Sequence, residues 1–297
     1  MYSLRSLSGQ EVAGFSEFTF PYYRAVLNEM SLGGRMVAVG AVLPQEPVGL
    51  AFAELKDNLK TAVIRSIAVA PQQRRIGIGT ALLRRVEREL SARGCGIAEV
   101  IYMAGRPSTP ALESLLRSNG WPTATPRLMI CTSDFELLSR APWMKPTDFP
   151  PAFDVFPWKD LTSADRADLL ECQERELLYP EALSPFAHED LTDPTCSFGL
   201  RHKGRLVGWC IVQQFGAGTL RCSSLFVRKE FEAQGRAIAL LARSVHATPD
   251  TGRPNFIFDV SFERPRMIRF VRRRMAPYLK SIRITNESRK KLTGVAA

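Results

Sequence analysis

Two arginines followed by two glycines make the stretch of this sequence that is best suited to binding an anion. The stretch is "PQQRRIGIGTALL", in which Arg74 and Arg75 come just before Gly77. A second glycine, Gly79, follows, and an apolar pattern typical of a helix begins there. The first turn of a helix leaves backbone N–H groups without intrahelical partners, and glycine lets the backbone approach a ligand closely. Because guanidinium groups bind phosphate oxygens in pairs, this spacing predicts a phosphate or pyrophosphate site.

Two common nucleotide motifs fit this loop poorly. A Walker loop requires lysine after its last glycine, whereas Gly79 is followed directly by Thr80. A dinucleotide fingerprint begins directly after a strand and has a third glycine where Leu82 stands. Glu99 does stand about 20 residues further on, where such folds carry an acid for the ribose. A helix that simply begins with glycines, and binds nothing, is the other alternative.

A second copy of this stretch lies 158 residues further along the chain. The segment "RSIAVAPQQRRIGIGTALLRRV" aligns without a gap with "SSLFVRKEFEAQGRAIALLARSV". Gly77 then meets Gly235, and an Ala-Leu-Leu tripeptide occurs at the same place in both. Matches that keep one order and one offset indicate a duplicated domain.

Each half of the chain shows the same predicted order of elements. In the first half we expect strands at 2–7, 35–43, 48–55, 61–69 and 97–103, with further strand material up to 135, and helices at 10–30, 77–92 and 110–118. In the second half we expect strands at 196–202, 205–214, 219–227 and 255–262, and helices at 162–178, 235–247 and 265–275. Antiparallel strands followed by strand–helix–strand–helix predict an α+β fold with a mixed sheet.

A proline-rich segment near the middle of the chain separates the two halves. "RAPWMKPTDFPP" carries four prolines in twelve residues, and proline interrupts both helices and central strands. We therefore expect one domain at 1–139, a linker at 140–152 and a second domain at 153–297. A length of 297 residues agrees with two domains.

The positive charge is concentrated at the end of the chain. The formal net charge is +10, and the last 44 residues hold eleven Lys or Arg against three acidic residues. This pattern indicates either a solvated helix face or a surface for an acidic partner, such as a phosphorylated ligand, an acidic peptide or nucleic acid. Phe270 and Tyr278 hardly interleave with the basic residues, so a platform for stacking single strands has weak support.

Other features exclude several classes of protein. No apolar run approaches the ~20 residues of a membrane-spanning helix, and the N-terminus lacks the apolar centre of a signal peptide, so we expect a cytoplasmic protein without a membrane partner. The six cysteines include no Cys-x-x-Cys spacing, and the three histidines are scattered. This pattern indicates no metal site and no disulfide framework. Most of the cysteines are interpreted as small core residues.

The motif Arg74-x-x-Gly77-x-Gly79 after a strand ending in "IAV" resembles motif A of the GCN5-related N-acetyltransferase (GNAT) family. The continuation "TALLRRVE" and the later "RPSTPALESLLRSNGW" extend the resemblance over most of residues 2–138, with a weaker copy over 153–290. The resemblance implies two tandem GNAT-like domains. Each would have a mixed, mostly antiparallel sheet flanked by helices.

The resemblance also implies a reaction and a cofactor site. Acetyl-CoA would be the co-substrate, without a metal, and its acetyl group would pass directly to a primary amine of a small molecule or peptide. The resemblance, carried over residue by residue, implies that Ile67, Ala68 and Val69 bind the pantetheine arm. It implies that the pyrophosphate is bound by Arg74, Arg75, Ile76, Gly77, Ile78, Gly79 and Thr80. Thr109 stands where many members have an asparagine that contacts CoA.

The general acid and base of the resembled family are not matched at their usual positions. The frequent tyrosine acid corresponds to Leu116, and the acidic base of some members corresponds to Val63. The remaining candidates are Glu54, at the end of a central strand, and Tyr102, on the strand after the glycine loop and its helix. There are three alternatives. Glu54 is an ordinary residue at a solvated strand end, Tyr102 is an ordinary packed tyrosine, or the amine is deprotonated through water.

The second copy departs from the motif because Glu232 stands where the first copy has Arg74. A carboxylate repels a pyrophosphate, although Arg236 could compensate in part. We therefore expect the active CoA site in the first domain, with the second serving as a scaffold or substrate platform. The alternative is a non-catalytic acyl-CoA-binding or regulatory module that contacts an acidic partner through the basic C-terminal region. A nucleic-acid partner is left open but less favoured, as is a longer acyl donor.

Overall fold

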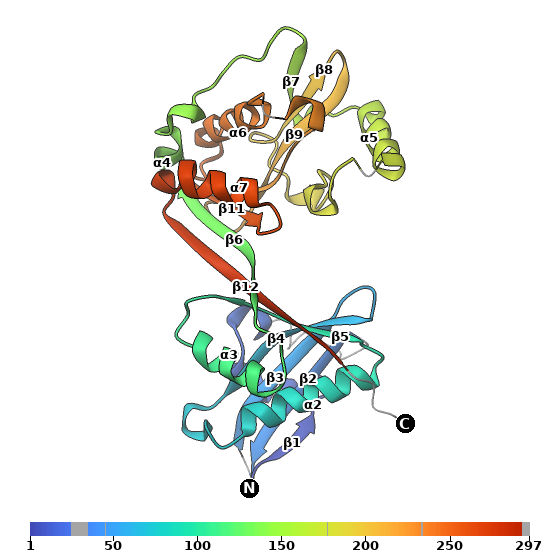
Figure 1. Cartoon of the computed structure of the whole chain (residues 1–297), viewed down its shortest axis with the longest axis vertical. Helices are drawn as coiled ribbons and strands as arrows, with labels where there is room; N and C mark the ends of the chain where they lie inside the picture. Colours follow the sequence, from blue (N-terminus) through green and yellow to red (C-terminus); the bar gives the residue numbers. More distant parts are fainter. Residues whose placement is uncertain (25–34, 45, 177, 233, 293–297) are drawn as a thin grey trace. The chain divides into compact units, whose positions relative to one another are not determined.

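The computed structural model describes residues 1–24, 35–44, 46–176, 178–232 and 234–292 (Figure 1). The chain divides into two compact units. The first unit consists of Met1–Arg127 together with Ile284–Ala297, and the second consists of Leu128–Arg283. Each unit contains a sheet with helices packed on it, so the expected α+β class is confirmed for both.

The sheet of the first unit has the strand order β1-β2-β3-β4-β5-β12. These strands are β1 (Ser3–Ser6), β2 (Met36–Leu43), β3 (Glu46–Leu55), β4 (Thr61–Val69), β5 (Ile97–Met103) and β12 (Ser281–Lys291). All neighbours pair antiparallel except β4 and β5, which are parallel. Strand β5, predicted at 97–103, and strand β4, predicted at 61–69, have the expected bounds.

Helices cover both faces of this first sheet. α2 (Ile78–Ala92) packs on β2, β3 and β4 and buries a row of residues spaced four apart, namely Ile78, Leu82, Val86 and Leu90. α3 (Thr109–Ser118) adds Leu116 to the same core. On the other face, the 3-10 helix η1 (Gly9–Phe18) packs Val12 and Phe15 against Leu50 and Phe52. Residues 25–30 of the helix expected at 10–30 lie outside the described residues.

The sheet of the second unit has the order β6-β11-β10-β9-β8-β7. These strands are β6 (Thr125–Asp134), β7 (Phe153–Pro157), β8 (Phe198–His202), β9 (Arg205–Gln214), β10 (Thr219–Val227) and β11 (Asn255–Ser261). The pair β10–β11 is parallel, and the other pairs in this unit are antiparallel. The sheet therefore has the same mixed plan as that of the first unit.

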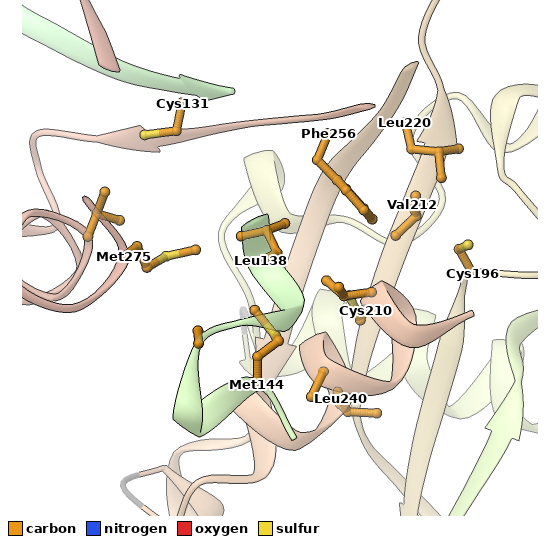
Figure 2. Close-up of a cluster of buried hydrophobic side chains, with 14 of the residues drawn as sticks. Cys131, Leu138, Met144, Cys196, Cys210, Val212, Leu220, Leu240, Phe256 and Met275 are labelled. Carbon is orange, nitrogen blue, oxygen red and sulfur yellow. The ribbon is translucent and has the colours of Figure 1, made fainter. Parts of the chain in front are cut away.

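The core of the second unit lies between its sheet and its helices. The helices are α4 (Phe135–Ser139), α5 (Ser163–Glu176), α6 (Arg236–His246) and α7 (Pro265–Phe270), and α7 continues as a π-helical turn η9 (Val271–Met275). The unit also contains short 3-10 turns, which include η3 (Pro142–Met144), η4 (Trp158–Asp160), η5 (Glu181–Leu183), η6 (Glu189–Leu191), η8 (Thr248–Thr251) and η10 (Ala276–Tyr278). Figure 2 shows members of this core from strands, such as Val212 and Phe256, together with Leu240 of α6.

The structure reproduces the repeat at the predicted offset. Strands β4 and β5 reappear 158 residues later as β10 and β11, and η2 (Pro71–Gln73) reappears as η7 (Lys229–Phe231). A β-bulge also recurs, because the extra residue in β4 is Arg65 and the extra residue in β10 is Ser223. A shared bulge at one offset shows that the two units have the same backbone plan.

The last strand of each unit comes from the other half of the sequence. β6 lies in the first half of the sequence but pairs with β11 in the second unit, whereas β12 lies in the second half but pairs with β5 in the first unit. The division expected around 140–152 therefore differs from the structure, in which this segment lies within the second unit and buries Met144. Proline content identified an irregular segment, but it carries no information on which sheet a neighbouring strand joins.

Replacing Ser288 by proline should destabilise the first unit, although residue 288 lies far in sequence from residues 1–127, which make up most of that unit. Ser288 pairs with Val100 and donates a hydrogen bond to the Pro122 carbonyl at 2.7 Å. Proline removes a ladder N–H, whereas Ser288→Ala removes only the hydroxyl and should lower the free energy of unfolding by about 1 kcal/mol. Urea unfolding with mapped proteolysis should show a larger loss, and new cleavage within 1–127, for the proline variant alone. Equal behaviour of the two variants would contradict the assigned pairing.

Candidate functional site

The two parallel strands of the first sheet separate halfway along their length. β4 and β5 pair from Thr61–Ile97 to Ile64–Val100, and no pair is recorded between them beyond that point in the described chain. β3 continues to pair with β4 as far as Val69, and β12 continues to pair with β5 as far as Met103. The inner edges of residues 65–69 and 101–103 therefore face an opening whose backbone groups are available to a ligand.

Two local features hold β4 in place beside this opening. Arg65 is the bulged residue, and a bulge bends its strand and increases its twist. At the far end of the strand, Gly49 of β3 comes so close to β4 that a Cβ atom would lie 2.8 Å from the Ala68 carbonyl oxygen. Only glycine permits this approach, so Gly49 lets β3 pair with β4 along the whole edge of the opening.

The glycine loop lies at the end of this opening. Gly77 precedes α2 with φ of 89°, which is the left-handed region that favours glycine. The first backbone bond into the helix runs from Ala81 N to Gly77 O at 3.0 Å. The N–H groups of Ile78, Gly79 and Thr80 therefore precede the intrahelical pattern and carry the positive end of the helix dipole.

The two arginines of the loop take different positions. Arg74 folds back, and its Nε donates to the Val69 carbonyl at 3.0 Å. Arg75 has a positive φ of 70° and an exposed side chain. The structure thus brings the residues predicted for the pantetheine arm and the pyrophosphate to one place, the end of β4 and the start of α2.

Thr109, at the start of α3, is already engaged within the protein. Its hydroxyl accepts a hydrogen bond from Arg106 N at 3.0 Å and donates to the Met103 carbonyl at 3.2 Å. The residue therefore fixes the turn between β5 and α3. A direct contact between this hydroxyl and a ligand is not supported.

Tyr102 points from β5 toward α3 and is held by a carboxylate. Its hydroxyl donates to Glu113 Oε1 at 2.7 Å, and the Asn286 side chain on β12 also bonds to it. Burial, and then the bond to Glu113, raise the pKa of Tyr102 to about 12. The phenol is consequently protonated across the neutral range and is able to donate a proton.

Glu54 lies at the end of β3 with a cationic partner. Arg65 Nε and Nη2 both lie 2.9 Å from Glu54 Oε2, and the two side chains are 33% and 40% exposed. Nearby, the Ser66 hydroxyl donates to the Phe18 carbonyl at 3.3 Å, which anchors η1 to the sheet. Ser66 is thus a structural residue, and Glu54 lies opposite Val63 of β4, just before the point where β4 and β5 separate.

The two catalytic candidates lie on opposite faces of the sheet. Glu54 lies on the same face of β3 as Leu50 and Phe52, which pack under η1, whereas Tyr102 packs with the core under α2 and α3. The structure therefore does not bring Glu54 and Tyr102 together on one face. Sequence reasoning missed their partners Arg65, Glu113 and Asn286. Of these three, only Glu113 could have been found from the sequence. It stands on the same predicted helix as Leu116, which corresponds to the family's tyrosine acid, and three residues before it.

The second unit keeps the backbone of this site but has different side chains near its helix N-terminus. β10 and β11 last pair at Cys222–Phe258, and Gly235 precedes α6 with φ of 75°. In η7, before that helix, the centroid of the Phe231 ring lies 4.8 Å from that of His202 and 5.3 Å from that of Phe153. The Arg236 guanidinium lies 4.8 Å over the Phe153 ring. The Phe153 ring therefore packs against Arg236, the arginine that stands closest to Glu232 on the start of the helix in sequence.

The acceptor side of the second unit also differs. Gln213 stands at the position of Glu54, is buried, and donates to the carbonyls of Ala187 and His188. Ser223 stands at the position of Arg65 and donates to the Ile211 carbonyl. The second unit therefore has neither the carboxylate nor the arginine of the first.

Comparisons with known proteins agree with this geometry. The model of the acetyltransferase (GNAT) family matches residues 6–120. A GCN5-related N-acetyltransferase from Sphaerobacter thermophilus superposes with a TM-score of 0.67 at 17% identity, covering 99% of this chain and 98% of that one. A tandem GNAT protein from the clavulanic acid biosynthesis pathway gives a TM-score of 0.62 at 13% identity, with 99% of each chain covered. The comparison with curated proteins found no significant match.

Residues 6–120 therefore form a domain of the acetyltransferase (GNAT) family. The chain as a whole has the fold of a tandem GNAT protein, which confirms the resemblance that the sequence indicated. Among the helices in the described ranges, none is both long and apolar enough to cross a membrane. The described residues also contain no cluster of His, Cys, Asp and Glu arranged for a metal ion.

The environment of Tyr102 gives a direct test of the site's geometry. In the full chain labelled with [13Cζ]tyrosine, the Tyr102 resonance should not titrate up to pH 11. Glu113→Gln should lower the pKa, because a neutral amide no longer disfavours the phenolate. Tyr102→Phe assigns the resonance, and Glu136→Gln in the second unit serves as the control. A wild-type midpoint near 10, or no effect of Glu113→Gln, would contradict the assigned contact.

Proposed function

We propose that this chain is an acetyl-CoA-dependent N-acetyltransferase whose active site lies in the first unit. The observation that carries the proposal is the opening between β4 and β5, which leads directly to the glycine N-terminus of α2. An extended thioester arm fits between two separated strands, and a pyrophosphate fits the free N–H groups of a helix. The acceptor is proposed to be a primary amine of a small molecule or peptide.

The cofactor side is formed by the end of β4 and the loop after it. Ile67, Ala68 and Val69 offer the backbone edge that faces the opening, and these three residues are only partly buried. Residues 74–80 supply the helix N-terminus and two guanidinium groups, which favour a pyrophosphate electrostatically. When bound there, acetyl-CoA supplies a thioester carbonyl that an amine is able to attack.

Glu54 and Tyr102 divide the proton transfers between them. Glu54 takes a proton from the attacking ammonium or amine on its own face of the sheet, while Arg65 fixes the carboxylate. The N–C bond forms as the C–S bond breaks, and Tyr102 gives its proton to the departing thiolate from the opposite face. Glu113 and Asn286 fix the position of the Tyr102 hydroxyl, and its proton leaves the hydrogen bond to Glu113 when it passes to the thiolate.

The second unit is proposed to act without CoA, as a scaffold or substrate platform. Its loop carries Glu232 in place of an arginine, and the Arg236 guanidinium lies over the Phe153 ring. Gln213 replaces the carboxylate on the acceptor side. These three differences all disfavour acetyl transfer at the second site.

A matched pair of glycine variants tests which unit binds acetyl-CoA. Gly77 and Gly235 both precede a helix with positive φ, so glutamate at either position introduces similar backbone strain and the same charge. Calorimetry with the full chain should give one site for wild type, affinity at least about 100-fold weaker for Gly77→Glu, and no change for Gly235→Glu. The proposal fails if wild type does not bind, or if the two variants bind alike.

Glu54→Gln tests the proposed base. Release of free CoA thiol should be followed with a panel of primary amines that includes a polyamine, amino acids and a peptide. We expect kcat to fall by about 10²- to 10⁴-fold, with acetyl-CoA affinity unchanged because Glu54 lies away from the cofactor loop. Glu46→Gln, at the other end of β3, is the matched control. An unchanged kcat for Glu54→Gln would show that water carries the proton instead.

A further inference from the structure

A helical segment of the second unit carries an array of arginines that the proposed reaction does not use. The segment consists of α7, the π-helical turn η9 and the N-cap residue before them, which is residues 264–275. The arginines are Arg264, Arg266, Arg269, Arg272, Arg273 and Arg274, and all six are exposed. No acidic residue occurs between positions 264 and 286.

The arginines occupy a face that the fold holds in place. Ile268, Val271 and Met275 are buried on the other side of the segment, within the core of the second unit, and Figure 2 labels Met275 among the core side chains. The Arg272 guanidinium lies 6.0 Å over the Phe262 ring. The charges are therefore presented on a packed helix and not on a free tail.

Nothing within the described ranges of the chain neutralises this face. None of the six arginines forms an ion pair with a carboxylate there, whereas Arg166, Arg201 and Arg221 of the same unit pair with Glu189, Asp165 and Asp259. Like charges three and four residues apart destabilise a helix. The array thus opposes folding, and an external polyanion would relieve the repulsion.

We propose that this arginine face binds the phosphodiester backbone of double-helical nucleic acid. Guanidinium groups bind phosphate oxygens in pairs, and several of them on one helix match a row of phosphates. Binding of this kind positions the protein without reading base sequence. The proposal is independent of the acetyl-CoA site, which lies in the first unit.

The side chains around the arginines favour a duplex over other polyanions. Phe270 and Tyr278 contact the Trp143 ring at 5.4 and 6.4 Å, so neither offers a free surface on which single-stranded bases stack. Within the helical segment Met267 is the one large apolar side chain that is exposed, at 38%. Protein interfaces have an apolar core, and membrane-surface helices have an apolar face; this segment has neither on its solvent side.

Fluorescence anisotropy with 24-base-pair DNA and RNA duplexes of mixed sequence tests the proposal on the full chain. Wild type should bind, with affinity falling steeply as NaCl rises. A triple variant tests the arginine face by combining Arg266→Gln, Arg269→Gln and Arg273→Gln. It should reduce the slope of log affinity against log salt by roughly 3 and weaken duplex binding on the order of 100-fold at 0.1 M salt. The control removes three exposed cations elsewhere, through Arg88→Gln, Arg117→Gln and Lys159→Gln. It should retain most of the affinity.

Four results would overturn the proposal. The first is that wild type binds neither duplex at 0.1 M salt, and the second is that the two triple variants lose equal duplex affinity. The third is tighter binding to a single strand than to a duplex. The fourth is that polyglutamate, or vesicles containing phosphatidylserine, bind as tightly as a duplex. Neither triple variant should melt below wild type, and the arginine-face variant should melt at the same or a higher temperature because it removes like-charge repulsion. The acetyl-CoA affinity of both variants should match wild type. That result separates a failure of this inference from a failure of the proposed enzyme site.

Discussion

The candidate site depends on backbone pairing that holds each of two neighbouring strands from its outer side only. β4 and β5 stop pairing after Ile64 and Val100, and unpaired strand edges are costly unless another strand or a ligand satisfies them. β3 holds the outer edge of β4, and β12 holds the outer edge of β5 to Met103. The opening is stable because the two outer ladders continue where the inner one stops.

This constraint explains why the end of the chain matters for the first unit. β12 not only completes the sheet but also brings Asn286 to Tyr102 and Arg289 to the buried Glu99, which Lys56 pairs from the other side. A buried carboxylate needs such partners, since losing one leaves an uncompensated charge. The strand that keeps the opening apart therefore also fixes the polar groups beside it.

The sequence predicted the elements well where a periodic pattern is local. β4, β5, β9 and β10 have the expected bounds, and the repeat at an offset of 158 extends to the bulges at Arg65 and Ser223. It did not predict the exchange of β6 and β12, or that residues 140–152 lie inside the second unit. Alternation of side chains identifies a strand, but pairing partners depend on contacts between residues far apart in sequence.

The candidate site was predictable to the same extent. Residues 67–69 and 74–80 come together because they are contiguous around one strand end. The pairs Glu54–Arg65 and Tyr102–Glu113 depend on which face each residue occupies, and a bulge at Arg65 changes that face within a single strand. Glu54 and Tyr102 lie on opposite faces of the sheet. Beyond Ile64 and Val100, no backbone pairs join β4 to β5 in the described residues. In the proposed reaction, the amine therefore approaches an acyl group in this opening from the Glu54 side and the thiolate leaves toward Tyr102, so the two groups need not compete for the same space.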